Sequence, residues 1–137
     1  MKRNFSIPTS IELQFDNYCM DLHNDYNVLN ISIQIENKII LKLLFGKNDG
    51  SWVNKNNPQR FSIIFEGVKN LEFIKDLSVP YKTPIHEIGF KNTDDKDYDW
   101  IMDEKQSSTD SNLFFWFASD EYLKIYSESA NLIIDAL

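Results

Sequence analysis

The fold class of this chain is decided by the stretch NVLNISIQIENKIILKLLF, residues 27–45. In residues 27–35, isoleucine and valine mostly alternate with asparagine, serine and glutamine, a period of two that is typical of a half-buried strand. Glu36 and Asn37 then form a short polar turn, and residues 38–45 return as a second apolar run. Two such runs on either side of a short polar pair predict an antiparallel hairpin.

Further strands are expected after this hairpin. A bend at Gly67 separates the first two of them, and Pro84 limits the third to the edge of a sheet. The fourth is apolar on both faces, as a central strand would be, whereas the last could be a strand or a short final turn. In chain order these segments are residues 60–68, 71–77, 84–90, 112–119, 122–129 and 131–137.

Residues 9–22 fit two structures. Thr9 and Glu12 have the spacing of a capping box, and apolar side chains at helical spacing follow, which favours a short helix. The alternating apolar side chains fit a strand equally well: Ile11, Leu13 and Phe15. A helix is the slightly preferred prediction.

The whole chain, residues 1–137, is expected to form one domain. We predict a mainly β fold, antiparallel and sandwich-like, with one or two short helices, and an α+β fold as the alternative. Cys19 is the sole cysteine, which excludes an internal disulfide and fits a reducing compartment. Neither a signal-peptide pattern nor an apolar run of membrane-spanning length is present. We therefore expect a cytoplasmic protein that makes no contact with a membrane.

Charge is unevenly distributed along the chain. Residues 1–70 contain eight basic and seven acidic side chains, whereas residues 71–137 contain six basic and fourteen acidic ones. An acidic half repels nucleic acid and attracts basic proteins, and no basic stripe is present to neutralise phosphates. We expect a protein partner, possibly a basic toxin domain, and no nucleic acid. The sequence indicates no oligomeric state.

The strongest candidate for a binding surface is the acidic run DDKDYDWIMDE, residues 94–104. Its alternating aspartates resemble the start of a calcium-binding loop, but Trp100 stands where that loop needs glycine and Gln106 where it needs glutamate. Aromatic rings among carboxylates are instead typical of an interface, with the rings as anchors and the charges guiding approach. The predicted partner-binding residues are Asp94, Asp95, Asp97, Tyr98, Asp99, Trp100, Asp103 and Glu104.

Asp21, His23 and Asp25 alternate just before the hairpin. Side chains two residues apart on a strand point the same way, so these three could converge on a metal ion. Asparagine and aspartate also gather at turns, where their side chains hydrogen-bond to nearby backbone. We prefer the turn and expect neither metal nor cofactor, and a metal-binding protein is kept as an alternative.

No pattern in the chain indicates catalysis. There is no serine elbow and no phosphate-binding glycine loop, and Cys19 and His23 would meet only on a helix, where cysteine is commonly a small buried residue. We expect the chain to have no enzymatic activity. Trp52, in the polar loop of residues 46–59, is expected to cap one end of the sandwich. If its ring is exposed, a small-molecule or carbohydrate-binding β-sandwich is a second alternative. Trp116 is expected in the core.

The pattern as a whole resembles a group of small bacterial proteins, several of which serve as immunity proteins of polymorphic toxin systems. The segments that carry the resemblance are DLHNDYNVLNISIQIENKIILKLLF (21–45), FSIIFEGVKNLEF (61–73) and LFFWFASDEYLKIYSESANLII (113–134). The chain departs from the group at Asn24, where an aspartate is expected after Leu22 and His23. The resemblance implies stoichiometric neutralisation of a toxin and no catalytic residues.

Overall fold

The computed structural model describes residues 1–50, 53–74, 84–95, 100–118 and 121–135. These residues form strands and no helix. The strands are β1 (Lys2–Arg3), β2 (Glu12–Phe15), β3 (Tyr18–Asp21), β4 (Tyr26–Ile35), β5 (Ile39–Lys47), β6 (Arg60–Ile74), β7 (Glu87–Lys91), β8 (Asn112–Ala118) and β9 (Glu121–Ile134). No described segment is therefore a helix that could cross a membrane.

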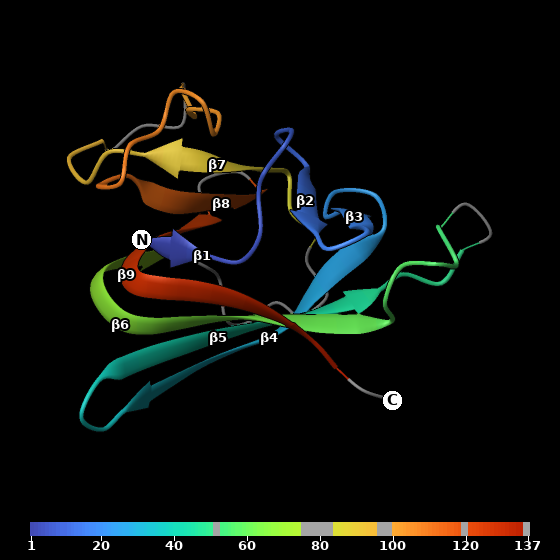
Figure 1. The fold of residues 1–137 in the computed structure, drawn as a ribbon, viewed down its shortest axis with the longest axis horizontal. Helices are drawn as coiled ribbons and strands as arrows, with labels where there is room; N and C mark the ends of the chain where they lie inside the picture. Colours follow the sequence, from blue (N-terminus) through green and yellow to red (C-terminus); the bar gives the residue numbers. More distant parts are fainter. Residues whose placement is uncertain (51–52, 75–83, 96–99, 119–120, 136–137) are drawn as a thin grey trace.

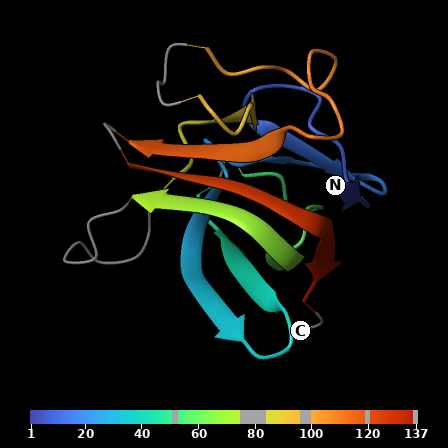
Figure 2. The same ribbon diagram turned by 90° about the vertical axis from the view of Figure 1, so that its left-hand side faces the viewer.

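Seven of the strands belong to one sheet, in the order β4-β5-β6-β9-β8-β7, with β1 parallel to part of β9. Figure 2 shows β8, β9 and β6 one below the other, with β5 and β4 beneath them. All pairings along this path are antiparallel. Strands β2 and β3 form a separate antiparallel hairpin.

The sheet bends over on itself because β6 and β9, of fifteen and fourteen residues, curve along their length. Figure 1 shows β7 and β8 in an upper layer and β4, β5 and part of β6 in a lower one. Gly67 lies at the bend with a φ of 67°, and the pairing of β6 with β9 shifts between Val68 and Asn70. The mainly β, antiparallel fold is confirmed, with both layers formed by one continuous sheet.

The hydrophobic core lies between the two layers. Phe65 of the lower layer and Phe115 of the upper layer are both fully buried, with ring centroids 6.3 Å apart. The β2–β3 hairpin adds Leu13 and Met20, which are paired across the two strands and fully buried. Each such side chain contributes about 1.5–3 kcal/mol by leaving water, so apolar burial holds the layers and the hairpin together.

The predicted hairpin is confirmed as β4 and β5, with Ile33 opposite Leu41. The predicted edge strand is β7, at one end of the sheet, and the predicted central strand is β8, between β7 and β9. The two segments on either side of Gly67 form one strand, β6, and the two last segments also form one strand, β9. The break predicted at Gly67 is therefore a local irregularity within β6, whereas the pairing of β9 continues without a shift through Ala130.

The helix predicted within residues 9–22 is wrong. The segment forms β2 and β3, joined by a turn in which Asp16 has a φ of 54°, a backbone conformation that aspartate tolerates better than most residues. Thr9 Oγ1 does donate a hydrogen bond to Glu12 Oε1 at 3.0 Å, but the pair precedes a strand. The alternating pattern prevails because pairing Leu13 with Met20 buries both side chains in the core.

The expectation that Trp116 belongs to the core is also wrong. Its neighbours Phe115 and Phe117 face the core, so the Trp116 ring lies on the opposite face of β8 and is only half-buried. There it packs edge-on against His86, with ring centroids 4.6 Å apart. Trp52, which was expected to cap one end of the sandwich, lies outside the described residues.

Candidate functional site

The predicted acidic run lies in the connection between β7 and β8. This connection leaves β7 after Lys91 and returns to the same edge at Met102, whose backbone forms two hydrogen bonds with Phe90, of 3.0 and 2.9 Å. We call residues 92–101 the acidic loop; its described parts are residues 92–95 and 100–101. The acidic loop is therefore an excursion that begins and ends at one edge of the sheet.

Two buried lysines hold the described parts of the acidic loop. Lys124 of β9 is fully buried, and its Nζ donates to the carbonyl oxygens of Thr93 at 2.8 Å and Asp95 at 2.7 Å. Lys91 of β7 is 1% exposed, and its Nζ donates to the carbonyl oxygen of Trp100 at 2.9 Å. Since a charge is buried only at high cost unless it is hydrogen-bonded, these carbonyl oxygens are required partners.

Side chains of three strands complete the support of the acidic loop. Lys124 Nζ lies 3.5 Å from Glu72 Oε1 of β6, so a carboxylate compensates its charge. The other Glu72 oxygen accepts a hydrogen bond from the Tyr122 hydroxyl at 3.0 Å. Asn112 of β8 donates to the Thr93 hydroxyl at 2.9 Å. The loop backbone next to β7 is thus attached to the outer face of β6, β8 and β9.

Three predicted partner-binding residues lie in the described parts of this loop. Asp94 is exposed, and no side-chain hydrogen bond of it is seen among the described residues. Asp95 is half-buried, and its Oδ2 accepts the backbone N–H of Asn92 at 3.3 Å. The Trp100 residue is 61% exposed although its backbone is held by Lys91. Three other predicted residues lie outside the described residues: Asp97, Tyr98 and Asp99.

The last two predicted residues lie beyond Met102, near the N-terminal segment. Glu104 Oε2 accepts hydrogen bonds from Arg3 Nη1 at 3.0 Å and from the backbone N–H of Ile7 at 2.6 Å. Asp103 is exposed, but its Oδ1 accepts the backbone N–H of Gln106 at 2.9 Å. Glu104 therefore joins two parts of the fold, whereas Asp103 keeps one carboxylate oxygen available at the surface.

Asp21 shapes the turn that leads into β4, as the turn interpretation predicts. Its Oδ1 accepts the backbone N–H groups of His23 at 2.9 Å and Asn24 at 2.8 Å, and its Oδ2 accepts the Asn24 amide at 2.9 Å. Desolvation, followed by the charge of Asp21, raises the pKa of the Asp25 carboxyl. Across the described part of the chain, no three histidine, cysteine or acidic side chains are placed to hold a metal ion.

Cys19 and His23 do not share a helix face. Cys19 lies exposed on β3, and its Sγ donates to Glu12 Oε2 at 3.0 Å. Desolvation, the hydrogen bond to Glu12 and the charges of Glu12 and Asp21 raise the pKa of the Cys19 thiol to about 11. The thiol is therefore protonated at neutral pH, which is the unreactive form of cysteine.

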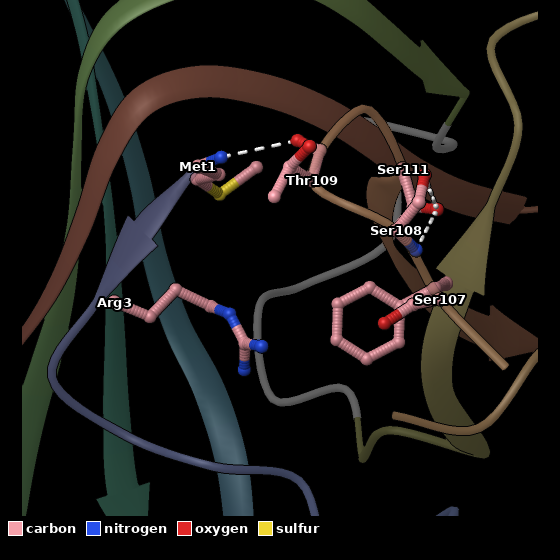
Figure 3. Close-up of a pocket in the computed structure, with 7 residues that line it drawn as sticks. Met1, Arg3, Ser107, Ser108, Thr109 and Ser111 are labelled. Carbon is pink, nitrogen blue, oxygen red and sulfur yellow. Dashed lines mark hydrogen bonds between the residues drawn. The ribbon is translucent and has the colours of Figure 1, made fainter. Parts of the chain in front are cut away.

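A cavity of about 310 Å³ opens beside the N-terminal segment. The Arg3 guanidinium lies 5.0 Å from the centre of the Phe90 ring at this cavity, and Figure 3 shows the side chains around it. The charge of Arg3 is compensated by Glu104 at 3.0 Å, so an anionic ligand would gain little from it. The lining residues are Met1, Arg3, Phe90, Ser107, Ser108, Thr109 and Ser111.

Sequence reasoning missed the two buried lysines. Each stands in a strand next to core residues, Lys91 after Phe90 and Lys124 between Leu123 and Ile125. A lysine in such an alternating strand is ordinarily on the solvent face. No local signal shows that a loop distant in sequence covers that face.

The chain was compared with protein-family models, with curated proteins and with solved structures, and no match was found. The resemblance to immunity proteins of polymorphic toxin systems is thus carried by the sequence segments alone. It stays a prediction.

Proposed function

We propose that this chain is a non-enzymatic protein-binding domain that holds a basic partner against the acidic loop. The kind of partner that the sequence resemblance implies is a toxin, which the chain would neutralise by stoichiometric binding. The observation that carries the proposal is that Trp100 is exposed in the same loop as the carboxylates of Asp94 and Asp95, on a backbone held by buried lysines.

The fixed backbone supports binding because ordering a flexible loop costs free energy on association. The Lys91 and Lys124 hydrogen bonds hold Trp100 and Asp95 before any partner arrives. Exposed tryptophans surrounded by polar groups are frequent energetic centres of interfaces. An indole presented in this way would bury much of its surface against a partner at little cost in conformational entropy.

The charges support a basic partner. Asp94 is exposed, and residues 71–137 carry fourteen acidic against six basic side chains. Clustered carboxylates accelerate association with a basic surface, an effect that weakens as salt screens the charges. An acidic surface of this kind would imitate the phosphates that a nuclease toxin binds.

The test is affinity capture from a lysate of the cells that make the chain, with the immobilised chain as bait. We expect a basic protein to be captured at about 0.15 M salt and released at about 1 M, where the Debye length falls from about 8 Å to about 3 Å. Trp100→Ala should reduce its capture at least tenfold, a loss of about 1.4 kcal/mol or more. Asp94→Lys should also reduce the capture of the basic protein, and by a larger factor at low salt than at high salt.

Asp110→Lys is the matched control, since Asp110 is also exposed and the change in net charge is the same. It should leave capture unchanged. A captured protein whose binding survives both Trp100→Ala and Asp94→Lys would refute the proposed surface. If the captured protein is toxic when expressed alone, coexpression of the chain should restore growth, and failure to do so would refute inhibition.

A further inference from the structure

Strand β4 is a free edge of the seven-stranded sheet. Only its β5 side is paired, and outside that ladder the described residues give residues 27–35 no backbone hydrogen bond. Residues 30–35 are exposed, apart from the half-buried Ile31. The outward N–H and C=O groups of this segment are thus open to pairing with another strand.

This edge lacks the features that usually prevent such pairing. Edge strands are commonly protected by charged side chains, proline or a bulge, and residues 27–35 contain neither a charged residue nor proline. The one irregularity of β4, between Val28 and Asn30, precedes the exposed segment. Residues 30–35 therefore form a regular, uncharged strand, although the chain as a whole has a net charge of −7.

One face of the exposed segment is apolar. Ile31, Ile33 and Ile35 lie opposite Leu43, Leu41 and Ile39 of β5, on the face that forms the core farther along the sheet. At the tip of the hairpin this face loses its cover, and Ile33 is 44% and Ile35 75% exposed. The cover ends because the pairing of β5 with β6 stops at Ile40 on the side of the hairpin tip, and β6 bends away at Gly67. Figure 1 shows the tip standing apart from the rest of the sheet.

We propose that β4 pairs with β4 of a second copy of this chain, antiparallel about a two-fold axis at Ile33. In this register Ile33 faces its own counterpart, Ile31 faces Ile35, and Ser32 faces Gln34. Three isoleucines from each copy then share one face, and hydroxyl and amide side chains share the other. Because the contact is isologous, it closes on itself and gives a dimer with one continuous sheet.

A second copy fits this edge better than a foreign partner does. The edge pattern is complementary to itself in the two-fold register, and an uncharged segment is where two acidic chains repel each other least. Glu36, the nearest acidic side chain, would face Asn30 of the other copy, so no like charges are opposed. A basic partner would gain nothing from charge at this edge and is better matched to the acidic loop.

Sedimentation velocity over roughly 1 μM to 1 mM, the range expected of small interfaces, tests the dimer. We expect the wild-type chain to pass from monomer to dimer, and Ile33→Lys to remain monomeric throughout. Ile133→Lys is the matched control, because Ile133 is 48% exposed and lies on β9 away from the free edge. A chain that is monomeric at all concentrations, or a dimer that Ile33→Lys leaves intact, overturns the proposal.

Cysteine cross-linking then tests the register, in a Cys19→Ser background. Ile33→Cys should form an intermolecular disulfide under mild oxidation, since residues directly opposite on antiparallel strands have Cβ atoms about 4.5–5.5 Å apart. Ile35→Cys should cross-link at least tenfold more slowly, because it faces Ile31 of the other copy. Equal rates for the two variants, or no disulfide from Ile33→Cys, would refute pairing about Ile33.

Discussion

The two ends of the bent sheet reverse the usual distribution of side chains. Under the acidic loop, Lys91 and Lys124 are almost completely buried, whereas at the tip of the β4–β5 hairpin Ile33 and Ile35 are exposed. Charged residues are rarely buried unless paired, and isoleucine is among the residues most often found inside. The difference lies in what covers each strand: the outer face of β8 and β9 has a loop above it, while the inner face of the hairpin tip is bare.

The comparison indicates that each exception has a separate physical cause. The lysines are buried with acceptors, three backbone carbonyl oxygens and the Glu72 carboxylate. Among the described residues, the isoleucines at the tip are only partly covered because β6 departs from β5 at Gly67. Buried charge at one end therefore serves to fix a loop, and exposed apolar surface at the other is the surface that the proposed dimer would use.

The largest effect is expected from Lys124→Met. The change removes the donor that Lys124 supplies to the Thr93 and Asp95 carbonyl oxygens and the positive charge that it places 3.5 Å from Glu72. Removing one partner of a buried ion pair costs about 3–5 kcal/mol. We therefore expect a loss of that size in the free energy of unfolding, measured by urea denaturation.

Lys42→Met is its matched control. Lys42 is an exposed lysine of β5, so the same chemical change should alter the free energy of unfolding by no more than about 0.5 kcal/mol. If the two variants are equally stable, the buried lysines are not required to hold the loop, and the contrast between the two ends loses its physical basis.

A smaller loss is expected from Gly67→Ala, at the bend that separates the hairpin from the rest of the sheet. The φ of 67° costs alanine about 1–2 kcal/mol, and an added Cβ would lie 2.6 Å from the Glu128 carboxyl carbon. The double variant with Glu128→Ala removes the contact but keeps the backbone strain. It should recover only part of the loss in urea denaturation; full recovery would show that the bend tolerates a side chain.

Cys19 sharpens the comparison because its neighbours oppose its charged form, whereas the acceptors around the buried lysines stabilise theirs. Desolvation, followed by the hydrogen bond to Glu12 and the charges of the Glu12 and Asp21 carboxylates, raises the pKa of the Cys19 thiol to about 11. At pH 8 the thiolate fraction is then far below that of an ordinary cysteine, whose pKa is about 8.5. Alkylation by iodoacetamide should be more than about tenfold slower in the folded chain than in the urea-unfolded chain.

The variant Glu12→Gln separates the effect of the Glu12 charge on the thiol pKa from the effect of desolvation. It removes a negative charge beside Cys19 and leaves the desolvation, so alkylation should accelerate without reaching the unfolded rate. The rate should rise with pH up to the thiol pKa in both proteins. A folded wild-type chain that reacts as fast as the unfolded one would show that the thiol is ionised as easily as in water.

Most of the strands could be predicted from the sequence because their periodicity is local. The hairpin of β4 and β5 follows from alternation around Glu36 and Asn37, and its register is the one that puts Ile33 opposite Leu41. The helix predicted before it failed because local spacing was ambiguous. That ambiguity is resolved by Met20, which pairs with Leu13 only across a turn and buries both in the distant core.

The surroundings of the predicted site could not be predicted, because they depend on contacts between distant residues. The acidic run with Trp100 is visible in the sequence, but its attachment to Lys124 joins residues twenty-nine or more positions apart. The internal use of Glu104 likewise depends on Arg3 and Ile7, near the other end of the chain. The acidic run suggested six equivalent carboxylates, whereas the fold distinguishes exposed Asp94 from paired Glu104.

The smallest effect is expected from Ile35→Thr at the hairpin tip. Threonine keeps the β-branched shape that suits a strand, and Ile35 is 75% exposed, so little apolar contact is lost within the monomer. At low micromolar concentration the free energy of unfolding should change by no more than about 0.5 kcal/mol, while dimer formation at high concentration should weaken. A loss above about 1 kcal/mol in the monomer would mean that the tip is packed in solution. The exposed isoleucines would then belong to folding and not to association.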